Sequence, residues 1–334
     1  MNVGAAAAAI LIAAITCLVL VRLLRPLLVR YALARPNARS GHRVPTPQGG
    51  GIAVLAAVIA GTAGPLLAGA LPGAGGPLLV LAVAATGIAL LGAVDDIRPL
   101  PVIPRLAGQA IAVVLALTAG GAELRLLPEV PLAVERGLEL FAGLWFVNLT
   151  NFMDGLDLMT AAETVPLAAA LAGLALAGWL PPAAGVVAGA LLGALLGFVP
   201  HNWPVARLFL GDVGSLAIGL VLAWLLYRLA AAGAITAAVL LPMYYCLDAS
   251  ITLLRRLRRG ERIWQAHRDH FYQQAADRGM PGLTIVGWVV ALNLVLVALA
   301  VLSLIYDGVA AQIALVLAGA VLAGLVLARF AGRV

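Results

Sequence analysis

Apolar runs of about 20 residues recur along the whole chain, and short segments between them carry most of the charged residues. A helix that rises 1.5 Å per residue needs about 20 residues to cross the hydrocarbon core of a bilayer. The pattern predicts about eleven membrane-spanning helices. Their expected ranges are 3–24, 49–71, 76–94, 102–120, 138–153, 160–180, 183–200, 213–232, 234–253, 283–305 and 310–330. No segment between them is long enough for a soluble domain, so we expect one all-α polytopic membrane domain over residues 1–334.

Composition agrees with this prediction. The hydrophobic share is 63%, the charged share is 11% and the mean hydropathy is +1.06, which excludes a soluble domain of this length. The first apolar run lacks a preceding positive region and is followed by Arg22, Arg25 and Arg30, which predicts a retained helix rather than a cleaved signal peptide. Cys17 and Cys246 lie in apolar runs, where we expect packing rather than a disulfide or a metal site.

The basic residues are distributed asymmetrically among the predicted helices. The chain has no lysine, so its 21 basic residues are all arginines. With the N-terminus outside and the C-terminus in the cytoplasm, all but Arg125, Arg136 and Arg228 fall on the cytoplasmic side, as the positive-inside rule requires. The net charge of +6 then lies on one face, where it attracts anionic membrane lipids; no nucleic acid partner is expected.

Acidic and amide residues gather at the predicted cytoplasmic ends of the helices. Asp95 and Asp96 end the third helix, the segment NLTNFMDGLD (148–157) ends the fifth, and Asp212 precedes the eighth. One acid pair alone is explained equally well by side chains that reach back to water. Because these acids come from separate parts of the sequence, one shared site is favoured. We expect it on a face formed by the loops at 30–48, 95–104, 153–160, 201–212 and 254–282.

The residue types in this site favour a divalent cation and a phosphorylated ligand. Carboxylates without histidine or cysteine in liganding register are typical of Mg²⁺ or Mn²⁺, which one or two carboxylates hold together with substrate phosphates. The segment 255–274 adds six arginines together with His267 and His270, a combination suited to a pyrophosphate. A zinc site would need more histidines or cysteines than this region contains.

Two acidic positions have competing interpretations. Asp154 and Asp157 are three residues apart, so they share a face if the segment between them is helical. Asp248, inside the ninth predicted helix, forms an ion pair with Arg255 or Arg256 or acts in catalysis, and the ion pair is the favoured interpretation.

Glycines mark several of these segments. Gly155 allows an irregular turn, and the run at 49–51 offers backbone N–H groups to an anion. Gly211 and Gly214 flank Asp212, which permits close approach of a ligand before a helix begins. The glycines at 185, 189, 193 and 197 form a stripe that favours close helix packing, with a homodimer contact as the alternative.

Four motifs, taken together, resemble one enzyme family. They are VDD (94–96), NLTNFMDGLD (148–157), the segment from NWP to GDVGS (202–215) and HRDHFYQ (267–273). In this order they resemble the polyprenyl-phosphate N-acetylhexosamine-1-phosphate transferases, over most of the chain from about residue 39 to residue 273. The HRDH motif is similar to the O-antigen-initiating branch of this family rather than to the peptidoglycan enzyme.

The resemblance implies a multi-pass enzyme of the bacterial inner membrane with a periplasmic N-terminus and an active site facing the cytoplasm. It implies transfer of a sugar 1-phosphate from a UDP-N-acetylhexosamine to undecaprenyl phosphate, with release of UMP and with Mg²⁺ or Mn²⁺ as cofactor. The lipid-linked product would initiate O-antigen or a related cell-envelope polysaccharide. No motif specifies which N-acetylhexosamine is used.

The resemblance also implies roles for individual residues. The catalytic residues would be Asp95, Asp96, Asp212, His267 and His270, and the metal would be held by Asp212 and Asp95. The substrate-binding residues would be Thr46, Asn151, Asp154, Asp157, Asn202, Phe209 and Arg268. Among these, uracil would be held by Asp157, Asn202 and Phe209.

Two other functions are weighed against this one. A transporter is disfavoured because ionisable residues near the bilayer midplane and internal repeats, both typical of transporters, are not found in the sequence. An intramembrane magnesium-dependent prenyltransferase would use the segment NFMDGLD for a diphosphate. That function would leave the GDVGS and HRDH motifs without a role.

Overall fold

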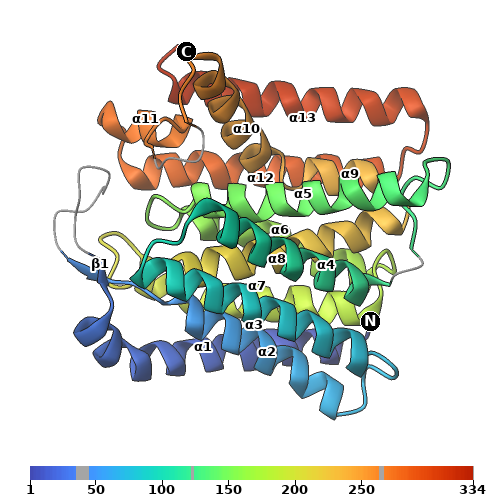
Figure 1. Cartoon of the computed structure of the whole chain (residues 1–334). Helices are drawn as coiled ribbons and strands as arrows, with labels where there is room; N and C mark the ends of the chain where they lie inside the picture. The colour runs from blue at the N-terminus through green and yellow to red at the C-terminus, as the bar shows by residue number, and fades with distance from the viewer. Residues whose placement is uncertain (35–44, 122–123, 263–266, 334) are drawn as a thin grey trace.

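The computed structural model describes residues 1–34, 45–121, 124–262 and 267–333, and these are almost entirely helical. The helices are α1 (Val3–Tyr31), α2 (Gly51–Leu67), α3 (Gly75–Ile97), α4 (Val102–Gly120), α5 (Leu132–Phe152), α6 (Met159–Leu176), α7 (Pro182–Asn202), α8 (Asp212–Ala231), α9 (Ile235–Leu240), α10 (Met243–Arg258), α11 (Phe271–Asp277), α12 (Gly282–Ser303) and α13 (Val309–Phe330). Most long helices run side by side, and the two termini lie at opposite ends of the bundle (Figure 1). Two parts of the predicted loops, 35–44 and 263–266, lie outside the described residues.

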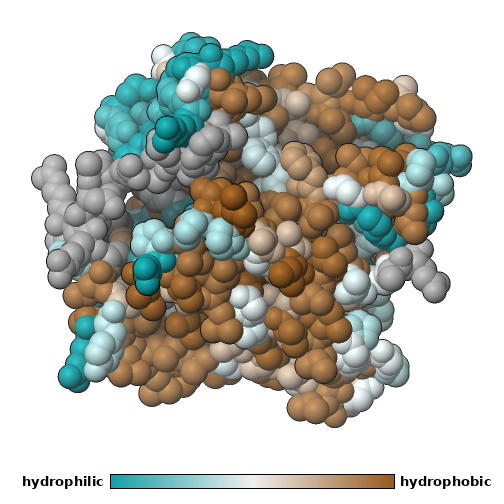
Figure 2. All heavy atoms as spheres, in the orientation of Figure 1, coloured by the Kyte–Doolittle hydropathy of each residue, from teal (hydrophilic) through white to brown (hydrophobic). Residues whose placement is uncertain are grey.

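Each predicted span contains a helix of the structure. The predicted helix at 234–253 is divided into α9 and α10 at Pro242, whose ring nitrogen has no N–H to continue a helix. Among the residues that the structure describes, eight helices are long and apolar enough to cross a membrane, and α2 is a shorter apolar helix. Hydrophobic atoms cover the middle of the face in Figure 2, while hydrophilic atoms gather over α10 and α11. The chain is therefore a polytopic membrane protein, and the number of crossings stays a prediction.

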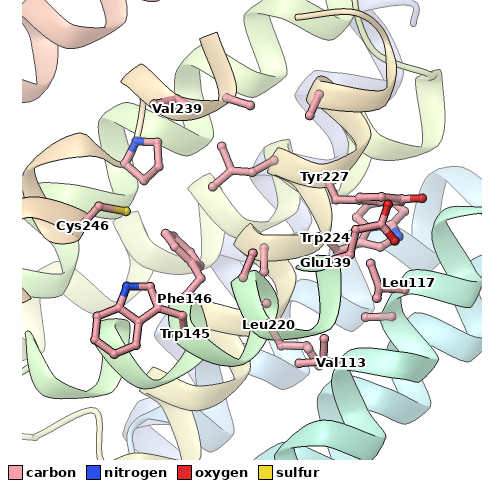
Figure 3. Close-up of a pocket in the computed structure, with 18 of the residues that line it drawn as sticks. Val113, Leu117, Glu139, Trp145, Phe146, Leu220, Trp224, Tyr227, Val239 and Cys246 are labelled. Carbon is pink, nitrogen blue, oxygen red and sulfur yellow. The ribbon is translucent and has the colours of Figure 1, made fainter. Parts of the chain in front are cut away.

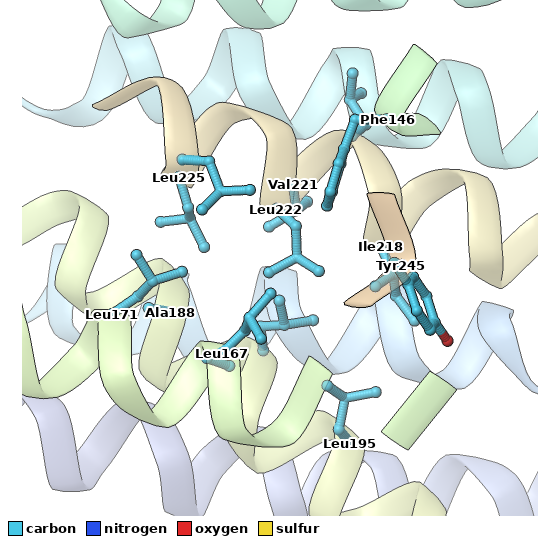
Figure 4. Packing of buried hydrophobic residues seen from close by; sticks show 14 of the residues in the cluster. Phe146, Leu167, Leu171, Ala188, Leu195, Ile218, Val221, Leu222, Leu225 and Tyr245 are labelled. Atoms are coloured by element: carbon cyan, nitrogen blue, oxygen red, sulfur yellow. The ribbon is translucent and has the colours of Figure 1, made fainter. Parts of the chain in front are cut away.

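Helix α8 lies at the centre of the bundle. In its most apolar stretch 83% of the residues are buried, against 22% in α1 and 17% in α13. It packs against α2, α3, α4 and α5, and Leu222 and Leu225 of α8 lie in the core near Leu171 of α6 (Figure 4). Because α8 is enclosed, the residues at its N-terminus are held by several neighbouring helices.

Glycines let two of these neighbours approach the N-terminus of α8 closely. A β-carbon on Gly51 of α2 would lie 2.1 Å from the Cα atom of Gly214. A β-carbon on Gly92 of α3 would lie 2.4 Å from the carbonyl oxygen of Asp212. These contacts leave no room for a larger residue, so they fix how α2 and α3 meet α8.

The glycine stripe of α7 serves internal packing. A β-carbon on Gly193 would lie 2.1 Å from the carbonyl oxygen of Ile10, and one on Gly197 would lie 2.7 Å from that of Ala14. The stripe is thus largely covered by α1 of the same chain. Its packing interpretation is confirmed, and its use as a homodimer contact is wrong because the surface is already buried.

Two short strands were not expected from the sequence. Strand β1 (Leu33–Ala34) pairs antiparallel with β2 (Thr46–Pro47), and Gln48 forms an isolated bridge with Phe209. The segment before α2 is thereby joined to the segment before α8.

The glycine contacts at α8 predict a difference between two alanine substitutions in α3. Gly92→Ala should lower the free energy of unfolding by about 1–3 kcal/mol, because its β-carbon overlaps the backbone of α8. Gly87→Ala is the matched control, since a β-carbon there meets no atom within 4 Å and alanine favours helix by about 1 kcal/mol. Thermal unfolding of both variants in detergent measures the difference. Equal midpoints would contradict the packing that fixes α8.

Candidate active site

The N-terminus of α8 is capped by a carboxylate from another helix. Gly211 precedes the helix with φ 76°, and the backbone N–H groups of Asp212 and Val213 donate to Asp96 at 3.1 and 3.3 Å. The first N–H groups of a helix have no partner within it and favour an anion. Asp96 at the end of α3 supplies that anion.

The side chain of Asp212 is held by α5. The amide nitrogen of Asn151 donates to Asp212 at 2.8 Å and to Ser215 at 2.9 Å. One turn earlier, Asn148 donates to Gln109 of α4 at 2.7 Å. Asn151 therefore orients a site carboxylate, whereas Asn148 links two helices.

Asp95 lies beside Asp212, within hydrogen-bonding reach of its carboxyl group. Its own oxygens accept from the Leu100 N–H at 2.6 Å and from Arg105 at 3.2 Å. The Nε atom of Arg105 is buried and has no partner among the described residues. Arg105 lies ten residues after Asp95 in the next helix, and no local spacing indicated this contact.

Carboxylates from three chain segments therefore crowd one end of the bundle. Asp154, in the connection between α5 and α6, has a pKa raised to about 7, first by burial and then by the charges of Asp212 and Asp96. Among the residues that the structure describes, no three Asp, Glu, His or Cys side chains come together to enclose an ion. Asp95 and Asp212 provide at most two ligands, and other oxygens would have to complete a metal site.

The segment after α5 is not helical, so the expected shared face of Asp154 and Asp157 is wrong. Helix α5 ends at Phe152, and α6 begins only at Met159. Asp154 accepts a short hydrogen bond from Thr160, while Asp157 accepts the N–H of Ala206 at 3.0 Å. The two carboxylates thus bind different segments.

The residues predicted to hold uracil lie around the same connection. Asn202 accepts the N–H of Leu158 at 2.7 Å and donates to the carbonyl of Leu208 at 3.1 Å. Leu158 has φ 63°, which side chains rarely adopt, so Asn202 stabilises an unusual turn. Phe209 is partly exposed next to β2, in which Thr46 is buried. The nucleotide contacts of these residues stay predictions.

The glycines around the site serve protein contacts rather than an anion. The N–H groups of Gly50 and Gly51 donate to the carbonyls of Phe209 and Leu210 at 2.9 and 2.8 Å. Gly214 packs against α2, and a β-carbon on Gly211 would lie 2.7 Å from Asp96. These glycines were expected to let a ligand approach closely. In the structure they let other segments of the chain approach closely instead.

His270 is buried and held by Asp248. Its Nδ1 atom lies 3.2 Å from Asp248, which also accepts the N–H groups of Phe271 and Tyr272 at 3.1 and 3.4 Å. A carboxylate only accepts, so Nδ1 carries the proton. The Nε2 atom is buried and has no partner among the described residues.

The favoured ion pair of Asp248 with Arg255 or Arg256 is wrong. Asp248 faces the core and is fully buried, whereas Arg256 forms ion pairs with Glu261 and Asp269. Arg255 lies over the ring of Phe271 at 4.4 Å. The spacing of Tyr244, Asp248 and Thr252, four residues apart on one face, was the sequence signal for a buried polar cluster.

His267 and Arg268 lie on the outer side of His270. The rings of His267 and His270 are stacked with their centroids 4.9 Å apart. The pKa of His267 is lowered to about 4, first by burial and then by His270 and Arg256, so this imidazole is neutral near pH 7. Arg268 forms an ion pair with Asp277 at 2.7 Å.

The histidine segment is docked onto the segment that follows α5. The Tyr272 hydroxyl donates to the carbonyl of Phe152 at 3.3 Å, and the ring of Phe152 lies 6.4 Å from that of His270. A β-carbon on Gly155 would lie 2.3 Å from the Tyr272 hydroxyl. Gly155 therefore permits this contact, and all the predicted site residues lie at one end of the bundle.

A further buried acid near this end was missed. Glu163, one turn into α6, accepts from Asn293 of α12 at 2.7 Å and is almost completely buried. A single acid in an apolar run gave no indication of its partner, because Asn293 is 130 residues away along the chain.

Comparison with known proteins finds similarity to one enzyme family. The model of glycosyl transferase family 4 matches residues 78–230, which include Asp95, Asp96, Asn151 and Asp212. The decaprenyl-phosphate N-acetylglucosaminephosphotransferase of Mycobacterium leprae is 29% identical over 293 residues, covering 74% of this chain and 71% of that protein. The protein of the same name from Mycolicibacterium smegmatis is 31% identical over 223 residues, covering 59% and 53%.

A second kind of relative matches a shorter range. The phospho-N-acetylmuramoyl-pentapeptide-transferase of Desulforudis audaxviator is 36% identical over 164 residues, covering 40% of this chain and 48% of that protein. The family model and both kinds of relative agree with the motifs that gather at the N-terminus of α8. These similarities support the polyprenyl-phosphate N-acetylhexosamine-1-phosphate transferase family and a transferase enzyme.

Proposed function

We propose that the protein transfers a sugar 1-phosphate from a UDP-N-acetylhexosamine to undecaprenyl phosphate and releases UMP. The observation that carries this proposal is the convergence of Asp95, Asp96, Asn151 and Asp212 from three helices, next to the docked histidine segment. Similarity to this family gives no support to the transporter and prenyltransferase alternatives. In this reaction one phosphoanhydride is broken and another is formed, so no further energy source is required.

The main obstacle to this reaction is electrostatic. The phosphate of the acceptor lipid must approach a pyrophosphate that is already anionic, and both must be held in line. Fixed positive groups and a divalent cation reduce this repulsion without reorganising during the reaction. The site end of the bundle supplies such groups in Arg105 and the arginines of α10.

Asp95 and Asp212 fit a hard divalent cation, Mg²⁺ or Mn²⁺. Both ligands are carboxylates, they are neighbours, and further carboxylate charges lie close by with few cations to balance them. When bound, the cation would neutralise charge on the substrate phosphates. Asn151 keeps the Asp212 carboxylate in place, and Arg105 does the same for Asp95.

The hydrogen bonds of the carboxylates favour direct attack by the lipid phosphate. Asp96 uses its two oxygens to accept backbone N–H groups, and Asp95 uses its own for Leu100 and Arg105. These contacts hold each carboxylate in place and lower the nucleophilicity of its oxygens, while a lone pair on each oxygen stays available. A lipid phosphate is already ionised near neutral pH, so it needs no enzyme nucleophile.

The donor would lie between the histidine segment and the α7–α8 connection. Its pyrophosphate would be contacted by His267, His270 and Arg268. The Nε2 atom of His270 would donate to a phosphate oxygen only when the ring carries a proton on both nitrogens. Uracil would be held near Phe209, with Asp157, Asn202 and Thr46 forming and supporting that pocket. Asp154 would lie between the nucleotide and the metal.

The lipid tail of the acceptor would lie in an apolar cavity of about 390 Å³ between α4, α5, α8, α9 and α10 (Figure 3). Phe146 and Trp145 of α5 and Cys246 of α10 line it. The same two helices continue to Asn151 and Asp248. A chain lying in this cavity therefore points its phosphate toward the carboxylates.

The cellular setting is proposed from the charge distribution and the family. The eleven crossings, a periplasmic N-terminus, a cytoplasmic site and the bacterial inner membrane satisfy the positive-inside rule. The product would initiate O-antigen or a related cell-envelope polysaccharide. Because relatives are named for N-acetylglucosamine and decaprenyl phosphate, those two substrates belong in the first test.

The purified protein, incubated with Mg²⁺, a polyprenyl phosphate and a panel of radiolabelled UDP-N-acetylhexosamines, tests the reaction. We expect UMP and a lipid-pyrophosphate-linked sugar, and mass spectrometry of the lipid identifies the sugar. If no UDP sugar in the panel yields UMP, the proposed reaction is wrong.

Asp212→Asn should abolish UMP formation at any Mg²⁺ concentration while the protein remains folded, because the amide loses the charge that holds the cation. The expected loss is at least about 1000-fold. Asp307→Asn, an exposed acid at the other end of the bundle, is the control. Retention of more than about a tenth of the activity, equivalent to about 1.4 kcal/mol in the barrier, would remove Asp212 from the metal role.

Asp248→Asn should lower kcat/KM by about 10- to 100-fold, because a charge-assisted hydrogen bond to His270 is lost. Thr252→Val is the matched control, since Thr252 contacts the same carboxylate without holding the histidine. Thermal unfolding of both variants distinguishes loss of His270 positioning from loss of the fold. Unchanged activity in Asp248→Asn would mean that His270 is not positioned for catalysis by this carboxylate.

Cys246→Trp should fill the apolar cavity and raise the KM for undecaprenyl phosphate by about tenfold, the effect of about 1.4 kcal/mol. The KM for the UDP sugar should not change. Leu254→Trp, on the same helix but exposed at the surface, is the control. Equal effects on both KM values, or none on either, would exclude this cavity as the site of the lipid tail.

A further inference from the structure

A second cavity lies at the end of the bundle opposite the carboxylates. Its volume is about 440 Å³, within the range of ligand sites. It is bordered by the α2–α3 connection, the C-terminal end of α4, the N-terminal end of α7, and α8. Asp212 begins α8 and Arg228 lies near its other end, so the two sites are about 24 Å apart along the helix axis.

Arg228 brings an unbalanced charge to this cavity. Of the three arginines at this end, Arg125 is paired with Glu135 and Arg136 with Glu139. Arg228 lines the cavity and makes no ion pair or hydrogen bond within the described ranges. A cation at the predicted outer side that lacks an acid is unfavourable unless an anion from outside the chain balances it.

Trp224 supplies a second donor on the same face of α8, one turn before Arg228. Its indole nitrogen is buried and has no partner among the described residues. A β-carbon added to Gly120 would lie 3.6 Å from this indole nitrogen. A β-carbon added to Gly121 would lie 3.6 Å from Nη1 of Arg228. The two adjacent glycines at the end of α4 therefore lie against both donors, and Trp224 also lines the apolar cavity beside Glu139.

The rest of the lining favours an anion with apolar substituents. Helix α7 begins here at Pro182 without a side-chain cap. Because Pro181 and Pro182 have no N–H, the N–H groups of Ala183 and Ala184 present the positive end of this helix. The described lining contains no acidic residue and is mostly Ala, Gly, Pro and Leu. Glu139, the acid near Trp224, lines the other cavity and is paired with Arg136.

We propose that this cavity binds the phosphate of an anionic phospholipid headgroup, with Arg228 and the indole N–H of Trp224 as donors. A lipid is favoured over a free phosphate because the cavity is larger than one phosphate, its walls are apolar, and it lies where a membrane span ends. The proposal concerns a site separate from the transferase site and does not depend on the reaction there.

Native mass spectrometry of the full-length protein in detergent tests this site by titration with phosphatidylglycerol. Arg228→Gln should weaken binding of this lipid by about tenfold, because a charge-assisted hydrogen bond is lost. Trp224→Phe, which keeps the ring but removes the donor, should weaken it by about threefold. Arg25→Gln, which removes an exposed arginine at the opposite end, is the matched control and should weaken binding less than Arg228→Gln does.

Three results would overturn the proposal. The first is equal binding of phosphatidylglycerol to Arg228→Gln and to the unchanged protein. The second is displacement of the lipid by inorganic phosphate at equal concentration, which would identify free phosphate as the ligand. The third is an equal loss of thermal stability in Arg228→Gln with and without added lipid. This result would mean that Arg228 only stabilises the fold, by balancing the partial negative charge at the C-terminal end of α4.

Discussion

The contact between the Asp96 carboxylate and the first N–H groups of α8 is the interaction on which the site depends. This contact requires α3 to lie so close to α8 that only a glycine fits at position 92. It also requires Gly211, which adopts a positive φ that other residues rarely adopt. Once Asp96 occupies this position, Asp212 must lie next to Asp95 and Asn151. The same contact that completes a helix end therefore gathers negative charge, and this grouping is unfavourable until a cation balances it.

The polar groups around this point are held by other groups of the protein. Asn151 is bound to Asp212 and Ser215, and His270 is fixed by the fully buried Asp248. Groups arranged in this way do not have to reorganise when charge moves between two phosphates, which is the main catalytic advantage of a preformed site. The Nε2 atom of His270 and the Nε atom of Arg105 have no partner among the described residues.

The hydrophobic runs predicted every long helix, because a span must be apolar over a fixed length whatever it packs against. The acids of the motifs were also found from the sequence, since a carboxylate in such a chain is itself unusual, although Glu163 was missed. Their partners were not found. Asp248 was expected to bind arginines nearby in sequence, yet it binds His270, and the shared face of Asp154 and Asp157 failed because α5 ends first. Contacts between distant segments depend on how helices pack, which local spacing does not encode.

The break between α9 and α10 has a consequence for how a lipid would reach the site. Pro242 interrupts the helix beside the apolar cavity. At the start of α10, Met243 and Cys246 line that cavity. Farther along the same helix, the buried Asp248 contacts His270. Helix α5 is arranged similarly: Phe146 lines the cavity, and Asn151 farther along the helix binds the Asp212 carboxylate. Along both α5 and α10, an apolar part that lines the cavity is therefore followed by a polar part at the carboxylates. If the acceptor lipid binds here as proposed, this order alone would align it, because its tail is stable only beside the apolar part and its phosphate only beside the polar part.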